Sequence, residues 1–118
     1  MLISLIPTAS ANFWISDSSI VSGLGDVGSR SSPTVYNDSG TWKLISGEDS
    51  GVFNGYYWGG STWTSDSNIV NGLGDVGAHS TPTVYNDGGT WKLISGEDSK
   101  VFNGYHWNRS EERRVGRV

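Results

Sequence analysis

Two adjacent acidic pairs, Glu48-Asp49 and Glu97-Asp98, are the side chains best suited by type to acid–base or metal chemistry. The two carboxylates of a glycosidase must face each other across the substrate. Neighbouring residues in a turn instead point apart, and each pair stands in a Gly-Glu-Asp-Ser run that is typical of a turn. The pairs therefore favour a solvated turn over a catalytic or metal site.

A second kind of carboxylate, Asp26 and its counterpart Asp75, lies inside the string G-L-G-D-V-G. A carboxylate between glycines can cap a turn, or it can meet a ligand where two structural units join. Turn capping is the favoured interpretation. Ligand contact by Asp26 and Asp75 is kept as the alternative.

The two histidines, His79 and His106, each stand alone, because Arg30 and Tyr57 hold the corresponding positions of the other copy of a repeat described below. A repeated histidine centre is therefore unsupported. The chain has no Cys, and it contains no nucleophile-elbow or phosphate-loop pattern. We expect a protein that is not an enzyme, with no cofactor and no metal.

The aromatic residues recur in pairs: Trp14/Trp63, Tyr36/Tyr85, Trp42/Trp91, Phe53/Phe102, Tyr56/Tyr105 and Trp58/Trp107. Most should form a core between units, because aromatic rings bury large areas. An exposed minority could stack on sugar rings while nearby amides and carboxylates supply hydrogen bonds. The candidate ligand-binding residues are therefore Asp26, Asp75, Asn54, Asn103, Trp58 and Trp107.

These residues recur because the chain is a tandem repeat of 49 residues. Residues 14–59 align with residues 63–108 without an insertion, and 36 of the 46 aligned positions are identical. Such similarity places equivalent residues in nearly the same environment and predicts an array of like units.

Each unit shows the pattern of four short strands, expected in the first unit at residues 33–36, 41–46, 52–58 and 62–65. Asn, Asp and Gly between the strands suit hairpin turns, and Gly55 indicates a bulge or a close backbone approach. Ile69-Val70 and the glycines after it connect to the next strand. No segment has a helical apolar period over three turns.

Four meandering strands in 40–50 residues match the size of a propeller blade. The expected fold is all-β, with two four-stranded antiparallel propeller blades, although a β-sandwich of two units is the alternative. The expected divisions are an irregular or truncated segment 1–13, units 14–62 and 63–108, and a non-repeat tail 109–118. Two blades cannot close a ring, so we expect self-association or further blades of a longer chain.

The string P-T-V-Y-N-D-x-G-T-W-K-L-I-S-G-E-D-S-x-V-F-N-G-Y-x-W resembles repeats of the FG-GAP and VCBS type. The resemblance covers residues 14–108 and implies a β-propeller. Family members that bind calcium use a D-x-D-x-D-G-type turn, whereas Asp38 and Asp87 each stand alone beside an Asn. Calcium takes six to eight oxygen ligands, so the family's calcium site does not carry over. The layout is also similar to blades of tachylectin-like propeller lectins, which implies carbohydrate binding.

Both ends depart from the repeat. Residues 2–6 and the Ala9-Ser10-Ala11 run suggest a signal peptide, but a truncated strand is the favoured interpretation, since a basic start is missing. The tail R-S-E-E-R-R-V-G-R resembles the sequencing-adapter read-through found at the ends of metagenomic reading frames. A genuine solvated tail is the alternative.

The charge distribution limits the partners. Residues 1–108 carry four basic and ten acidic side chains, and so acidic a body would repel a nucleic-acid backbone. No apolar run is long enough to span a membrane. We expect a non-enzymatic binding module of a secreted or surface β-propeller protein, with a glycan as its ligand. The alternative is a structural or adhesive propeller fragment that contacts other proteins.

Overall fold

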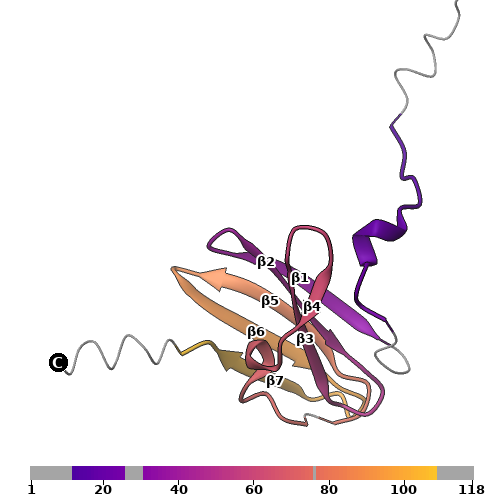
Figure 1. Ribbon diagram of the computed structural model, residues 1–118. Coiled ribbons are helices and arrows are strands. Elements are labelled where there is room, and N and C mark those ends of the chain that lie inside the picture. Colours follow the sequence, from indigo (N-terminus) through magenta and orange to yellow (C-terminus); the bar gives the residue numbers. More distant parts are fainter. Residues whose placement is uncertain (1–11, 26–30, 76, 109–118) are drawn as a thin grey trace, which may run out of the picture.

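The computed structural model describes residues 12–25, 31–75 and 77–108, and these residues form two antiparallel sheets and two short 3-10 helices (Figure 1). The first sheet has the order β1-β2-β3-β4. Its strands are β1 (Ser32–Asp38), β2 (Thr41–Gly47), β3 (Phe53–Trp58) and β4 (Trp63–Ser65). The all-β class and the meandering antiparallel order are confirmed.

The second sheet has the order β5-β6-β7. Its strands are β5 (Thr81–Asp87), β6 (Thr90–Gly96) and β7 (Phe102–His106). It therefore has three described strands and not the four predicted. The strand β4 belongs to the second sequence repeat yet pairs with β3 of the first. Residues 112–114, which align with β4, read Glu-Arg-Arg in place of Trp-Thr-Ser and lie outside the described residues.

The hairpins follow from their turn residues, as the sequence predicted. Ser39 and Gly40 join β1 to β2 with φ values of 53° and 97°, and two consecutive positive φ angles define the turn type that best suits a tight hairpin. The Asn37 Oδ1 accepts a hydrogen bond from the Gly40 amide at 2.8 Å. Asn86 makes the same bond to Gly89 at 2.9 Å, so both copies fold locally in the same way.

The two 3-10 helices were not expected from the sequence, which indicated only a connection. They are η1 (Ser18–Val21) and η2 (Ser67–Val70), and each begins after an Asp whose side chain accepts a hydrogen bond from the backbone two residues on. This is the usual role of Asp at a helix start. The helix η2 lies against β3 and places Ile69 between the two sheets.

The main core lies between the sheets. Ile45, Phe53, Ile69 and Leu93 are buried there. A second cluster of Leu44, Tyr56 and Trp63 lies elsewhere on the first sheet, with Leu24 and Trp58 packed against it. Gly55 pairs in register with Ile45, so β3 has no bulge at this position. A Cβ at Gly55 would lie 2.9 Å from the Ile69 Cβ, which explains the glycine as a close approach.

The repeat supplies a matched test of this core. Ile45→Ala should lower the free energy of unfolding by about 2–4 kcal/mol, because Ile45 is buried between the sheets. Ile94→Ala changes the equivalent but exposed residue and should cost less than about 1 kcal/mol in a monomeric chain. Urea unfolding measures both variants. Equal losses would contradict the position of the core.

Candidate functional site

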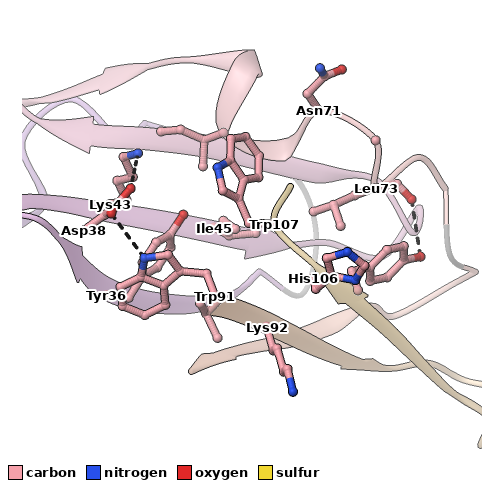
Figure 2. Close-up of a pocket in the computed structure, with 14 residues that line it drawn as sticks. Tyr36, Asp38, Lys43, Ile45, Asn71, Leu73, Trp91, Lys92, His106 and Trp107 are labelled. Atoms are coloured by element: carbon pink, nitrogen blue, oxygen red, sulfur yellow. Dashed lines mark hydrogen bonds and ion pairs between the residues drawn. The ribbon is translucent and has the colours of Figure 1, made fainter. Parts of the chain in front are cut away.

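A hollow of about 160 Å³ lies between the two sheets, beside η2 (Figure 2). One wall comes from β1 and β2, the opposite wall from β5, β6 and the end of β7, and the floor from η2 and the turn after it. The residues that line the hollow include Tyr36, Asp38, Lys43, Ile45, Ile69, Asn71, Leu73, Trp91, Tyr105, His106 and Trp107. The hollow is therefore lined by residues of both repeats.

Asp38 organises the polar wall of the hollow. One carboxylate oxygen accepts a hydrogen bond from Trp91 Nε1 at 3.2 Å, and the other accepts from Lys43 Nζ at 2.8 Å. Trp91 belongs to the second repeat, so its indole is held against the first repeat by a charged acceptor (Figure 2). Hydrogen bonds to charged groups are stronger than neutral ones. Asp38 thus fixes the position of an aromatic ring that faces the hollow.

Tyr36 lies beside the same ring. The Tyr36 and Trp91 ring centroids are 4.9 Å apart and the ring planes are tilted by 54°, which is a favourable aromatic arrangement. Burial, and to a smaller extent the negative charge of Asp38, raises the pKa of the Tyr36 phenol to about 12. The phenol is therefore a neutral hydrogen-bonding group at physiological pH.

The remaining walls combine apolar side chains with a few polar groups. Ile45 and Ile69 belong to the core between the sheets, and Leu73 carries a backbone carbonyl that accepts from the Tyr105 hydroxyl at 3.4 Å. The exposed Asn71, His106 and Trp107 stand at the rim. Such an arrangement suits a small ligand with one apolar face and several hydroxyl groups.

The structure does not bring the sequence-predicted ligand residues together. Trp107 lines the hollow, whereas Trp58 meets Trp63 edge-on, with ring centroids 5.3 Å apart. Asn54 and Asn103 each donate to the glutamate of their own repeat, Glu48 at 3.2 Å and Glu97 at 3.1 Å. These residues remain predictions, but only Trp107 lies at the hollow.

Of the two aspartates predicted with them, Asp75 lies in a described turn. The Asp75 carboxylate accepts a hydrogen bond from the Gly77 amide at 2.9 Å, which is the turn-capping role favoured by the sequence. Asp26 lies outside the described residues.

The acidic pairs have a structural role that the sequence did not reveal. His79 of the second repeat contacts Asp49 of the first through Nε2, and it lies 3.1 Å from Asp98 Oδ1 through Nδ1. Its φ angle of 61° and a backbone bond from the His79 amide to the Asp49 carbonyl at 3.1 Å place it there. Asp49 and Asp98, one from each acidic pair, therefore flank His79 at the junction of the repeats. No group of three or more His, Cys, Asp or Glu in the described ranges could hold a metal ion.

The residues that line the hollow were mostly missed by sequence reasoning. Asp38 was considered as a turn residue and as a calcium ligand. Tyr36 and Trp91 were grouped with the recurring aromatic residues but were not selected as ligand-binding residues. The available signal was the recurrence of Asp38 and Lys43 as Asp87 and Lys92, since a charge pair repeated beside an aromatic strand indicates a shared environment. The partner of Asp38 across the repeats becomes visible only once the two sheets are packed.

Comparisons with known proteins give no likeness from which to argue. The chain matches no family model, no curated protein and no solved structure. Within the described part of the chain, no helix has the length and apolar character needed to cross a membrane.

Asp38 and its exposed counterpart give a matched test of the polar wall. Asp38→Asn should lower the free energy of unfolding by about 1–2 kcal/mol, because it weakens charged hydrogen bonds to Trp91 and Lys43. Asp87→Asn removes an ion pair with Lys92 that has no such neighbour among the described contacts, and exposed pairs contribute little. Chemical unfolding should show a clear loss only for the first variant, and the reverse order would contradict the assignment.

Tyr36 gives a test in the alkaline range. Its pKa is raised in the folded chain from 10.0 to about 12, so its contribution to stability is complete below pH 10 and is lost as the pH rises through about 12. Absorbance of the phenolate should show a late-titrating tyrosine while the chain stays folded. Tyr36→Phe should remove that late step, and Tyr85→Phe, at the equivalent exposed position, should leave it. Burial also raises the pKa of Tyr56, so both variants are made in a Tyr56→Phe background. Persistence of the step in Tyr36→Phe would then contradict the burial of the Tyr36 phenol.

Proposed function

We propose that this protein is a non-enzymatic binding module, and that its ligand is a small saccharide bound in the hollow between the repeats. The observation that carries the proposal is the composition of this hollow. It joins indole and aliphatic surfaces to a carboxylate, an ammonium group and an amide within one concave site. Sugar rings have the matching chemistry, with an apolar C–H face and a polar edge.

Trp107 and Asp38 take the two recognition roles. Trp107 is exposed at the rim and lines the hollow, so its indole can cover the apolar face of a ring. Asp38 already orients Lys43 and Trp91 and can accept a hydrogen bond from a ligand hydroxyl. The volume of about 160 Å³ is below the roughly 300–1,000 Å³ typical of pockets for drug-sized ligands. A single sugar ring is therefore the proposed ligand, and not a longer chain.

The wider setting of the proposal is a β-propeller of a secreted or surface protein. Two observations support it. Each repeat forms a meandering antiparallel sheet, and β1 lies beside β5, so that successive sheets pack against each other. The acidic, Cys-free composition rich in Ser, Thr, Gly and Asn agrees with a secreted protein. An adhesive role is the second candidate, because exposed apolar residues gather on the second sheet.

Trp107 gives the direct test of ligand binding. A panel of monosaccharides is titrated into the chain at a concentration where light scattering shows a monomer, and binding is followed by tryptophan fluorescence and calorimetry. Trp107→Ala should lower the affinity for the best ligand roughly 3- to 10-fold, as expected for the loss of one aromatic contact. Trp58→Ala, at the equivalent position outside this hollow, should bind normally. Absence of binding across the panel, or equal effects of both variants, would reject the proposal.

A further inference from the structure

The two repeats differ most in what covers their aromatic and aliphatic residues. Phe53 is 5% exposed in the first sheet, whereas Phe102 is 78% exposed in the second. Ile69 of η2 is 7% exposed, whereas Ile20 of η1 is 61% exposed. One end of the described chain thus has an uncovered sheet face, and the other has an uncovered helical turn of the kind that covers that face.

The first sheet shows how its face is covered. The strand β4 pairs with β3, with Trp63 opposite Trp58 and Ser65 opposite Tyr56. The chain then turns, the Asp66 amide donates to the Gly55 carbonyl at 2.9 Å, and Ile69 packs on Ile45 and Phe53. We name residues 63–73 the covering segment. Residues 14–24 are its equivalent, and we name them the free segment because Trp14 is fully exposed and Ile20 covers no sheet. The Ile20 and Ser22 carbonyls hold the segment to its own chain, since they accept hydrogen bonds from Trp63 Nε1 and from the Trp63 amide at 2.8 Å each.

Glycines mark the space that the free segment fits. A Cβ on Gly55 would come within 2.9 Å of Ile69, but a Cβ on the equivalent Gly104 would meet nothing within 4 Å. A Cβ on Gly23 would overlap the Trp63 carbonyl, yet a Cβ on the equivalent Gly72 is in open space. Gly104 and Gly72 of the second repeat therefore border open space, whereas the equivalent Gly55 and Gly23 are in close contact with neighbouring residues.

The 3-10 turn of the free segment begins in the same way as the 3-10 turn of the covering segment. Asp17 precedes η1 with φ −146° and ψ 98°, and Asp66 precedes η2 with φ −148° and ψ 101°. Both side chains accept the same backbone hydrogen bond, at 3.1 Å and 3.0 Å. Docking this segment would require little ordering, and preorganisation of this kind favours association.

We propose that the free segment of one copy of this chain docks on the second sheet of another copy, in the way that the covering segment docks on the first sheet. Trp14 to Ser16 pair with the free edge of β7, with Trp14 opposite Trp107 and Ser16 opposite Tyr105. Ile20 covers Ile94, Phe102 and Gly104, and the Asp17 amide donates to the Gly104 carbonyl. The two surfaces differ, so the contact is head-to-tail and can continue from copy to copy.

The same contact builds a second hollow, and this part rests on the proposed function. The hollow described above joins Asp38 of the first repeat to Trp91 of the second. In a head-to-tail pair, Asp87 of one copy takes the place of Asp38, and Trp42 of the next copy takes the place of Trp91. Trp42 is exposed in the single chain. Each copy added to the assembly would therefore add one ligand site between copies.

Two charge substitutions at exposed positions test the contact. Ile20→Asp alters the free segment, and Phe102→Asp alters the second sheet. Sedimentation and light scattering of the full chain over a concentration series should show a mass that rises with concentration. Each variant should associate more than about tenfold more weakly, because the burial of one Ile or Phe side chain accounts for an effect of that order. Val101→Asp is the control, because Val101 and its equivalent Val52 are both exposed and the proposed contact leaves both uncovered.

A mixture of the two variants tests whether the contact is head-to-tail. Ile20→Asp keeps an intact second sheet and Phe102→Asp keeps an intact free segment, so an equimolar mixture should form a dimer of twice the chain mass and nothing larger. A symmetric contact between second sheets would instead leave Ile20→Asp associated. A monomeric wild-type chain, or a mixture that stays monomeric, would overturn the proposal. Gly104→Leu, which meets open space in the single chain, replaces Phe102→Asp if that variant fails to fold.

Saccharide binding is measured separately from association. Calorimetry on the assembled chain should give more than one saccharide site per copy in the limit of long assemblies. Trp58 of the next copy takes the place of Trp107 in the second hollow, so Trp58→Ala should lose the added site while keeping the first. Association without saccharide binding would support the contact and reject only the proposed function. Saccharide binding to a chain that never associates would do the opposite.

Discussion

The contact of Ile69 with Ile45 and Phe53 is the interaction on which the rest of the structure depends. A single four-stranded sheet of this size has two faces and cannot bury the apolar side chains of both. The 3-10 turn of η2 covers one face of the first sheet and is the last element before β5. The same short segment therefore closes one core, positions the second sheet and forms the floor of the hollow between them.

Much of this architecture could be predicted from the sequence because its causes are local. The Asn37 and Asn86 turns set both hairpins, and the alternation of residues 41–46 indicates a strand regardless of its neighbours. The period of 49 residues indicates that the two copies fold alike. The 3-10 helices were missed because four residues are too few to show a helical period, and the Asp that caps each one reads equally well as a turn residue.

The site was harder to predict because it depends on contacts between copies. The hydrogen bond from Trp91 to Asp38 joins residues 53 positions apart, and no local pattern reports it. Trp58 and Trp107 have the same sequence surroundings, yet only Trp107 lies at the hollow. Identity of sequence between the repeats thus predicts the fold of each copy well and its exposed surface poorly.

The packing between the sheets also determines how one repeat is placed relative to the next. A single operation relates the first sheet to the second, and any further unit added in the same way repeats that rotation and translation. Whether such a series returns to its start or continues as an open helix depends only on the size of that rotation. Ile45, Phe53 and Leu93 pack between the two sheets, so their volumes determine how closely the sheets can approach. The same small core that stabilises the chain therefore sets the curvature of any array built from it.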